Sequence, residues 1–371
     1  MTGEQIKSWI RARALELGFE RTGFTSAEPV EHGGALLDWL LRGRHGTMSY
    51  LARAPERRAD PRALLEGART VVCVLARYQA SPPGEHAVAA YAARPDYHVV
   101  LKQRLGALGN AIHERFPHTR WLACVDTAPL LERELAARAG LGWVGKSTML
   151  IEETIGCHTL LGELLLTLPL PNDQPAQDRC GTCTRCLDAC PTQAFLGPRL
   201  LDATRCLSYA TIEHRGATDA SLRTAQGRRA FGCDECLTAC PFGHQTRAAP
   251  SALLPTDEQL ARADALQLAA PAEKHCKKSF GHTPMLRASK RGLRRNLLVA
   301  LGNSGDERAV PAIVTALHDH DAMLREHAAW ALGAIGSDQA LSALVHAEPT
   351  ETDAVVRAAI ERALRSLARG S

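Results

Sequence analysis

The stretch Cys180-Gly-Thr-Cys183-Thr-Arg-Cys186-Leu-Asp-Ala-Cys190-Pro191 decides how the middle of this chain folds. Its spacing is C-x2-C-x2-C-x3-C-P, in which three closely spaced thiolates bind three irons of one cubane. The fourth thiolate, held away by a longer step and a proline, binds a second cluster. A second run, Cys233-Asp-Glu-Cys236-Leu-Thr-Ala-Cys240-Pro241, follows. Together the runs predict two interlocked 4Fe-4S clusters and therefore electron transfer.

The two cysteine runs share their ligands in this prediction. Cys206 departs from the simple repeat, because 26 residues separate it from Cys233 instead of two. We expect the intervening stretch to be an insertion over one cluster, inside a ferredoxin-like domain of residues 178–247. One cluster is expected on Cys180, Cys183, Cys186 and Cys240, and the other on Cys190, Cys206, Cys233 and Cys236.

Structural zinc and disulfides are the alternatives for so many cysteines. A zinc site needs four ligands and seldom has a third cysteine at the same step followed by Cys-Pro. Disulfides need an oxidising compartment. The first residues, Met1 to Lys7, form no apolar signal segment, so we expect a cytoplasmic chain, and no apolar run is long enough to span a membrane. The other thiols are expected to be small buried side chains: Cys73, Cys124, Cys157 and Cys276.

The composition predicts a globular protein of two or three domains, since 45% of the 371 residues are hydrophobic and 23% are charged. Apolar residues recur at helical spacing from Ile6 to Leu17 and stop at Gly18. Short β-rich runs occupy 70–76, 121–125 and 160–168. We therefore expect the α+β class for the chain, with an α/β amino-terminal domain over residues 1–177. The last part of that range, 169–177, is expected to be a linker.

The end of the chain repeats itself. Residues 293–305 align with 324–336 at a period of 31, and 356–364 form a weaker third copy. Small residues let paired helices stack closely, and this pattern is typical of a HEAT-like α-solenoid. We expect this repeat over 289–371, joined to the cluster domain by a connecting segment over 248–288.

A basic stretch leads into the repeat. Between Lys274 and Arg295 the chain has eight lysines and arginines and no acidic residue. Such a stretch either forms the solvated face of a helix or binds phosphates. Taken alone, the solvated face is the favoured interpretation.

The segment Gly140-Leu-Gly-Trp-Val-Gly-Lys146-Ser147 satisfies the phosphate-loop pattern G-x4-G-K-S. That loop works only between a strand and a following helix, where backbone amides surround the phosphate. Here a helix-forming run, 130–139, precedes the glycines, so Gly140 is expected to end a helix. We therefore do not expect nucleotide hydrolysis.

Asp126 follows a predicted strand and precedes a predicted helix that starts near Pro129. Its carboxylate has two interpretations, and the simpler is that it caps that helix. Alternatively it is a general acid, since apolar surroundings raise the pKa of a carboxyl group and let it deliver a proton to a leaving oxygen.

Several motifs together resemble one family. They are Asp126-Thr-Ala-Pro-Leu-Leu-Glu-Arg133, the glycine-rich 140–148, the cysteine runs with the displaced Cys206-Leu-Ser-Tyr, and the basic HEAT-like tail. Gly46-Thr-Met-Ser-Tyr-Leu51, Arg57-Arg-Ala-Asp-Pro61 and Tyr97-His98 add smaller matches. Over nearly its whole length the chain resembles the epoxyqueuosine reductases.

The resemblance implies a cobalamin enzyme with two 4Fe-4S clusters that completes queuosine at the wobble base of tRNA. It implies that Asp126 protonates the epoxide oxygen and that Lys290, Arg291, Arg294 and Arg295 hold tRNA phosphates. An external low-potential electron donor and a monomeric state are expected. The D-x-H-x-x-G motif that often places a histidine on cobalt is absent from the sequence. The residues implied to bind cobalamin are Arg58, Tyr97, Arg133, Lys146, Ser147, Thr148, Leu150, Leu161 and Ser208.

Two other functions remain open at this point. A reductive dehalogenase, or another corrinoid reductase of small molecules, would share the clusters and cobalamin, but it has no use for a basic helical repeat. A simple electron carrier would need only the cluster domain, which leaves the amino-terminal residues without a purpose.

Overall fold

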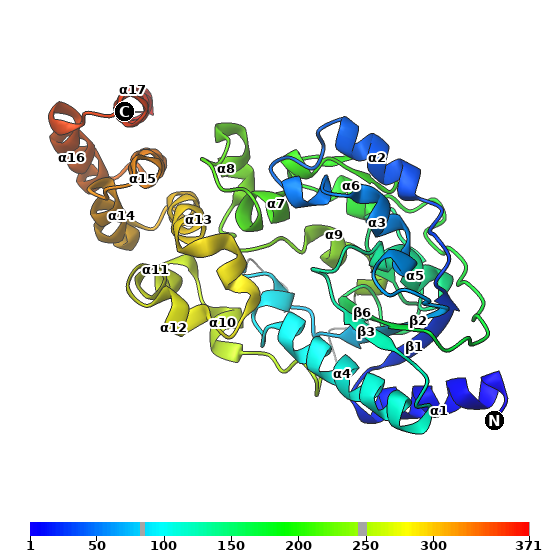
Figure 1. Ribbon diagram of the computed structural model, residues 1–371. Helices are drawn as coiled ribbons and strands as arrows, with labels where there is room; N and C mark the ends of the chain where they lie inside the picture. Colours follow the sequence, from blue (N-terminus) through cyan, green and yellow to red (C-terminus); the bar gives the residue numbers. More distant parts are fainter. Residues whose placement is uncertain (82–85, 244–250, 371) are drawn as a thin grey trace. The chain divides into compact units, whose positions relative to one another are not determined.

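The computed structural model describes residues 1–81, 86–243 and 251–370, which belong to two compact units (Figure 1). Unit 1 comprises 1–82, 94–204 and 234–256, and unit 2 comprises 83–93, 205–233 and 257–371. The mixture of helices and strands confirms the expected α+β class. Within the described ranges, no helix is both long and apolar enough to cross a membrane.

Unit 1 is built on a four-stranded sheet in the order β1-β2-β6-β3, with every neighbouring pair antiparallel. The strands are β1 (Arg21–Ser26), β2 (Thr70–Arg77), β3 (Trp121–Cys124) and β6 (Thr159–Leu166). All three strands predicted from the sequence are present. Seven of the eight residues of β2 are buried, because both faces of the sheet are covered.

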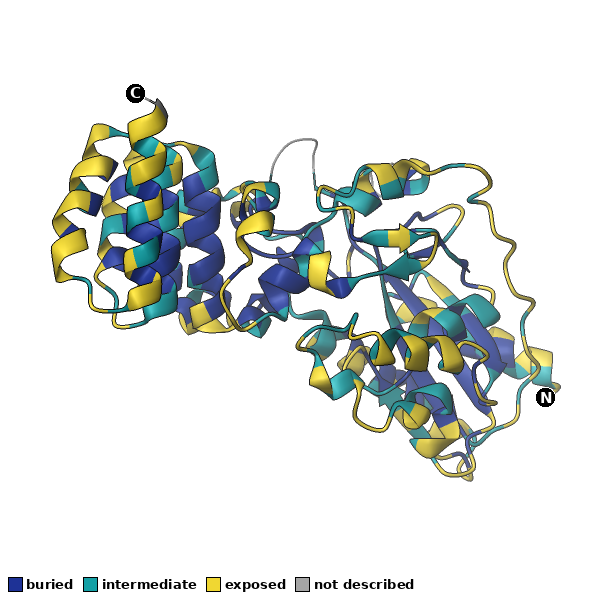
Figure 2. Cartoon of the chain, turned by 90° about the horizontal axis from the view of Figure 1, so that it is seen from above, coloured by how far each residue is buried: buried dark blue, intermediate teal, exposed yellow. Residues whose placement is uncertain are grey.

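Helices cover the two faces of this sheet. On one face α1 (Gly3–Glu16) and α4 (Tyr97–Arg115) pack on alternate strand residues such as Val72, Val74 and Leu164. On the other face α5 (Glu132–Arg138) packs on residues such as Val71 and Cys73. Figure 2 shows the central strands of the sheet mostly in buried dark blue, whereas the outer faces of the helices are exposed. The fold thereby brings the starts of α4 and α5 to the end of β3.

The predicted linker 169–177 has no regular structure, but Asp173 attaches it to the amino-terminal helix. One carboxylate oxygen lies 2.7 Å from Nζ of the buried Lys7, and the carboxylate accepts both a hydrogen bond from Arg11 and one from the amide of Phe24. Burial raises the pKa of Asp173, but the ion pairs with Lys7 and Arg11 and the hydrogen bond from the Phe24 amide lower it more, so the net shift is downward. The linker is therefore fixed along α1 and β1.

The rest of unit 1 consists of short elements. A small hairpin pairs β4 (Trp143–Val144) with β5 (Leu150–Ile151), and another pairs β7 (Phe195–Gly197) with β8 (Leu200–Leu201). Helices α6 (Arg185–Asp188) and α9 (Glu235–Thr238) pack on each other. The remaining helices are α2 (Gly33–Leu41) and α3 (Pro55–Ala59).

Unit 2 contains the predicted repeat. Helix α13 (Ser289–Ser304) packs on α15 (Ala322–Ile335), which packs on α17 (Ala354–Gly370). A Cβ at Gly302 would lie 2.8 Å from Cα of Ala331, so glycine is needed for the close approach of α13 and α15. Helices α14 (Val310–Leu317) and α16 (Asp338–Ala347) complete the repeats.

The stretch between Cys206 and Cys233 belongs to unit 2, where it packs on the repeat. It forms α7 (Leu207–Ile212) and α8 (Ala220–Gln226), and both contact α13. Unit 2 also contains α10 (Glu258–Arg262), α11 (Ala265–Lys274) and α12 (Cys276–Phe280). The sequence-based domain 178–247 thus contributes residues to both compact units.

Candidate functional site

Asp126 lies in the turn that follows β3, with a backbone φ of 47°. L residues rarely adopt this left-handed region, and it is held only where the surroundings impose it. The side chain is 45% exposed, and its Oδ2 lies 2.9 Å from Nε2 of His98. The turn therefore presents a carboxyl group at the surface in a constrained geometry.

The helix-capping interpretation of Asp126 is wrong. Helix α5 begins at Glu132, with Leu131 as its N-cap, so Asp126 lies too far before the helix to cap it. The start that we expected near Pro129 lies three residues too early. The apolar enclosure expected around Asp126 is not found either, since the carboxyl is partly exposed and faces a histidine.

His98 connects Asp126 to the start of α4. Its Nδ1 lies 2.7 Å from Oδ1 of Asp96, which caps α4 through the amide of His98. The ring of Tyr97 stacks on the imidazole at 4.1 Å between centroids. Burial lowers the pKa of His98, but the two flanking carboxylates raise it more, and the net shift is upward. His98 is thus suited to hold a proton next to Asp126.

Two further carboxyl groups lie behind the Asp126 turn, and the sequence analysis missed both. Oε1 of Glu132 accepts the backbone amide of Asp126 at 2.5 Å. Glu163, on β6, has no exposed surface. Burial and the charge of Asp126 raise the pKa of Glu132 to about 7, and burial together with Glu132 raises that of Glu163 well above its usual range. The sequence does contain one signal for this cluster, because Glu163 is the only charged residue in the otherwise apolar run of β6.

Two arginines, Arg58 and Arg133, lie near enough to this carboxyl cluster to interact with its charges. Nη1 of Arg133 donates to the backbone oxygen of Thr148 at 2.5 Å. Arg58 donates to the backbone oxygen of Tyr50 at 3.3 Å, and its buried Nε has no hydrogen-bond partner among the described residues. Burial lowers the pKa of both arginines, although Asp126 and Glu132 act in the opposite direction.

The segment that mimics a phosphate loop has a different structure. Gly140 follows α5 with φ of 77°, and residues 143–151 form the β4–β5 hairpin instead of a helix. Nζ of Lys146 donates to the backbone oxygens of Gly181 at 2.7 Å and Cys183 at 2.9 Å. Lys146 therefore attaches the hairpin to the first cysteine loop.

The remaining residues implied to bind cobalamin are spread over both units. Ser147 and Leu150 are buried in the hairpin, and Leu161 is half-buried on β6. Thr148 has a positive φ of 67° and accepts from Arg133. Ser208 lies on α7 in unit 2. The structure thus places Arg58 and Arg133 near enough to Asp126 to interact with its charge, and Thr148 contacts Arg133.

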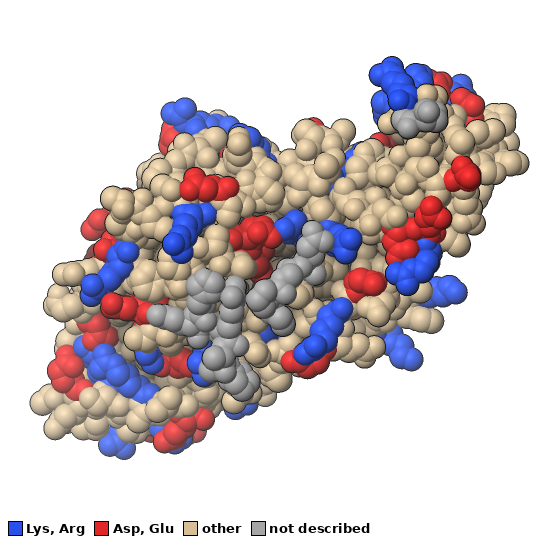
Figure 3. All heavy atoms as spheres, turned by 180° about the vertical axis from the view of Figure 1, so that it is seen from behind, with Lys and Arg blue, Asp and Glu red and all other residues tan. Residues whose placement is uncertain are grey.

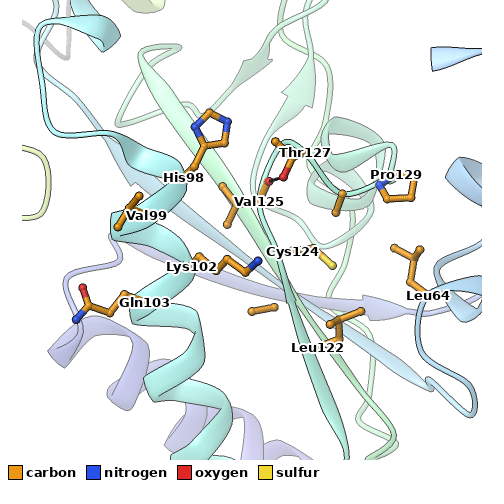
Figure 4. A pocket seen from close by; sticks show the side chains of 12 residues that line it. Leu64, His98, Val99, Lys102, Gln103, Leu122, Cys124, Val125, Thr127 and Pro129 are labelled. Atoms are coloured by element: carbon orange, nitrogen blue, oxygen red, sulfur yellow. Dashed lines mark hydrogen bonds between the residues drawn. The ribbon is translucent and has the colours of Figure 1, made fainter. Parts of the chain in front are cut away.

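A cavity of about 650 Å³ opens beside the Asp126 turn (Figure 4). Figure 4 shows His98 and Lys102 lining it from α4, while Cys124 lines it from the end of β3 and Val125 from the turn that follows. Its volume is in the range of small-molecule sites in proteins. The backbone on both sides of Asp126 therefore borders a space that can receive part of a substrate.

Six of the eight predicted cluster cysteines belong to unit 1. Burial raises the pKa of Cys186, and so do the neighbouring thiols of Cys240, Cys180 and Cys183. These four are the residues assigned to one cluster from the sequence. Among the described residues, no three His, Cys, Asp or Glu side chains meet at a single point as they would around one zinc ion. Thiolates of a cubane need not do so, because each binds a different iron.

The surroundings of this first cysteine set suit an iron-sulfur cluster. Nε1 of Trp143 donates to Sγ of Cys180 at 3.4 Å, and the indole packs edge-on against Phe242. Contact with the thiol of Cys157 lowers the pKa of Cys240 to about 6.

The cysteines assigned to the second cluster are divided between the two units. In unit 1, Cys190 accepts a hydrogen bond from the amide of Ala194 at 3.2 Å. Cys206 and Cys233 lie in unit 2.

The four basic residues predicted to bind tRNA differ in accessibility. Lys290 is exposed, and Arg291 is 49% exposed in an ion pair with Asp321. Arg294 lies between Glu273 and Asp319. Arg295 has no exposed surface, and it donates to the backbone oxygens of Ala210, His214 and Gly216. Lysine and arginine alternate with acidic residues on the face drawn in Figure 3.

Three family models match the chain. One described as epoxyqueuosine reductase QueG matches residues 58–127, a 4Fe-4S double cluster binding domain matches 179–243, and HEAT repeats match 283–365. An epoxyqueuosine reductase of Xanthomonas campestris pv. campestris is 39% identical over 338 residues, which cover 88% of this chain and 95% of the relative. The chain belongs to the epoxyqueuosine reductase family. The Escherichia coli epoxyqueuosine reductase is 36% identical over 89% of this chain and 88% of its own length.

Solved structures of epoxyqueuosine reductases have the same fold. A selenomethionine-labelled one has a TM-score of 0.89 and 29% sequence identity, and the alignment covers 99% of this chain and 100% of that one. A second, with a TM-score of 0.89, contains an epoxyqueuosine-modified stem loop of tyrosine tRNA. The resemblance to epoxyqueuosine reductases seen in the sequence is therefore confirmed.

Proposed function

We propose that this protein reduces epoxyqueuosine to queuosine at the wobble position of tRNA. The observation that carries the proposal is the Asp126 turn, which presents a carboxyl group with constrained backbone beside His98 and a cavity. A general acid must be within reach of the atom that it protonates, and this geometry leaves Asp126 accessible. Membership in the epoxyqueuosine reductase family supports the choice of substrate.

The reaction removes the epoxide oxygen and forms a carbon–carbon double bond, which consumes two electrons and two protons and releases water. We assign Asp126 to protonate the departing oxygen, because a neutral leaving group departs more easily than an alkoxide. His98 contacts the Asp126 carboxyl through Nε2, and its raised pKa lets the pair hold the one proton that Asp126 delivers to the departing oxygen. The second proton, which completes the water molecule, comes from solvent. Arg58 and Arg133 supply positive charge on the other side of the turn.

The residues around the turn fit a corrin with polar side chains. Arg58 has a buried Nε without a partner among the described residues, and Ser147, Thr148, Leu150 and Leu161 combine hydroxyl and apolar groups. We propose that cobalamin is held by Arg58, Tyr97, Arg133, Lys146, Ser147, Thr148, Leu150, Leu161 and Ser208. Bound cobalamin would supply a strongly reducing, nucleophilic cobalt(I) centre.

The match to a double-cluster domain supports two 4Fe-4S clusters, which would receive electrons one at a time from an external low-potential donor. We propose the ligand sets expected from the sequence, Cys180, Cys183, Cys186 and Cys240 for one cluster and Cys190, Cys206, Cys233 and Cys236 for the other. The mutual influence of the first four thiols supports the first set. The ranges 1–177, 178–247, 248–288 and 289–371 remain our proposal for the domains.

Exposed lysines of the basic stretch are the best candidates for tRNA contacts in unit 2. Four lysines of the stretch are exposed: Lys274, Lys277, Lys278 and Lys290. Burial raises the pKa of Cys276, and the charge of the nearby Lys290 offsets part of that rise. Arg295 is buried, so we no longer propose it as a tRNA contact. Arg294 is not proposed either, because it is already paired with Glu273 and Asp319. We further propose that the protein acts as a cytoplasmic monomer.

An anaerobic assay tests the proposed function. Full-length protein with reconstituted clusters and added cobalamin is incubated with a chemical reductant and an anticodon stem-loop that carries epoxyqueuosine. We expect conversion to queuosine, measured by mass spectrometry of the nucleosides, and none without cobalamin. A brominated phenol in parallel tests the dehalogenase alternative. Debromination without conversion of the stem-loop would contradict the proposal.

A further inference from the structure

Glu132 supports the Asp126 turn from behind. Its Oε1 accepts the amide of Asp126 at 2.5 Å, and it is the first residue of α5, a helix packed on the sheet. The φ of 47° at Asp126 is a conformation that a non-glycine residue keeps only when its surroundings impose it. A carboxyl oxygen that accepts the amide of that residue is such an influence, and the hydrogen bond is stronger when Glu132 is ionised, since charge-assisted hydrogen bonds are stronger than neutral ones.

Glu163 lies beneath Glu132 in the middle of the sheet. In the strand register it pairs with Cys73 of β2 and with Cys124 of β3, and it has no exposed surface. Neither carboxyl oxygen accepts a hydrogen bond from an N–H or O–H donor within the described part of the chain. Its polar neighbour is the carboxyl of Glu132, and a hydrogen bond between the two raises the pKa of Glu163 and lowers that of Glu132. Burying an ionised carboxylate without partners is very costly, so this position favours the neutral acid.

The charged groups around the pair reinforce this conclusion. Burial raises the pKa of Cys73 and that of Cys124, so both flanking thiols are neutral. Asp126 and Glu132 act on Glu163 as negative neighbours. Four cations on the surrounding elements act on these groups: Lys102 of α4, Arg133 and Arg138 of α5, and Arg58 of α3. They act on the thiols, Glu132 and Asp126, and none contacts the oxygens of Glu163.

We propose that Glu132 is a positioning residue that holds the Asp126 turn in its reactive conformation, and that a protonated Glu163 keeps the carboxyl pair behind the turn from carrying two charges. The inference rests on the proposed role of Asp126. Glu132 acts through the backbone amide of Asp126. Its removal therefore loosens the turn and displaces the proton donor, which slows the reaction without removing the acid itself.

Hydrogen exchange and turnover together test the proposal on full-length protein with clusters and cobalamin. For Glu132→Ala we expect faster amide exchange in peptides that cover 125–131. We also expect kcat to fall by about tenfold to a hundredfold with little change in KM, because a small displacement of a reacting group can slow a reaction by factors of this size. Glu132→Gln retains an acceptor oxygen and should restore most of both. Unchanged exchange in Glu132→Ala would overturn the proposal.

The same helix offers a matched control. Glu134 accepts the backbone amide of Glu31 at 2.6 Å, the same kind of bond to a different loop. Glu134→Ala should leave the exchange of 125–131 and the turnover unchanged. If it has the same effect as Glu132→Ala, the effect is a general loosening of α5 and the positioning role is refuted.

A double variant separates positioning from an independent role. In an Asp126→Asn background, Glu132→Ala should cost less than about twofold further in kcat, since residues that act as one unit are not additive. Multiplied losses would overturn the proposal. Glu163→Gln mimics the neutral acid and should stay within about twofold of wild type, whereas a tenfold loss would show that the charged form is needed. If Asp126→Asn itself keeps its turnover, the proposed function of Asp126 fails, but the exchange measurement still decides whether Glu132 holds the turn.

Discussion

The Asp126 turn and the first helix of the repeat, α13, were both expected to use charged side chains in function, and they use them differently. Asp126 is 45% exposed beside a cavity. On α13, by contrast, Arg295 is fully buried and donates to three backbone oxygens, while Arg294 is paired with two acids. The number of charged residues in a stretch of sequence therefore does not show how many of them a ligand can reach. That number depends on which of them are buried or paired in the tertiary structure.

The largest expected effect is at the Asp126 turn. Asp126→Asn keeps the shape of the side chain but removes the transferable proton. We expect both clusters and cobalamin to be retained and turnover to fall by about a hundredfold or more, as for the loss of a general acid. Spectra of the cofactors and single-turnover rates measure the two properties separately. Near-normal turnover would show that Asp126 is not the proton donor, so the turn would not differ from α13 in its chemical use of charge.

The second prediction concerns Arg295. Burial lowers its pKa to about 10, so the guanidinium is still charged at neutral pH and needs its partners. Arg295→Met leaves the carbonyl oxygens of Ala210, His214 and Gly216 without this donor. We expect a loss of about 3 kcal/mol in stability, seen in chemical denaturation. Lys290→Met, an exposed change on the same helix, should stay within about 0.5 kcal/mol. Equal effects would contradict the structural role of Arg295.

A third prediction tests which cations bind tRNA. Replacing Lys274, Lys277, Lys278 and Lys290 by glutamine should weaken stem-loop binding and flatten its salt dependence, by about 0.7 to 0.9 in the log–log slope for each lost phosphate contact. Fold and cluster content should be unchanged, since all four are exposed. Replacing four other exposed arginines of unit 2 by glutamine removes the same charge outside this stretch and is the control: Arg308, Arg357, Arg362 and Arg365. An unchanged slope would mean that this stretch is only a solvated face.

The smallest effect is expected at Trp143. Its indole N–H lies 3.4 Å from Sγ of Cys180, and hydrogen bonds to cluster sulfurs raise the reduction potential by stabilising the more negative reduced state. Trp143→Phe keeps the packing against Phe242 but removes the donor. We expect a modestly lower potential of one cluster in a redox titration followed by electron paramagnetic resonance, while the other cluster is unaffected. An unchanged potential would show that the contact has no electrostatic role.

Much of the fold could be predicted from local pattern. The strands at 70–76, 121–125 and 160–168, and the repeat helices with a period of 31, are present because each buries its own periodic apolar face. Helix α5 began later than expected, since Leu130 and Leu131 belong to the turn that presents Asp126. The attachment of 206–233 to the repeat depends on Arg295 and Asn296, which bond to backbone from distant segments, and no local pattern reveals such bonds.

By itself the sequence predicted the chemistry and the repeat, because cysteine spacing, the Asp126 motif and the repeat period are local properties that indicate candidate cluster ligands, a candidate acid and a solenoid. Only the tertiary structure decided which charges are usable. It placed Glu132 against the amide of Asp126 and Glu163 between two thiols, and it removed Arg295 from the surface. The physical reason is that burial and the partners of a charge, which set both its accessibility and its protonation, come from residues far apart in the chain.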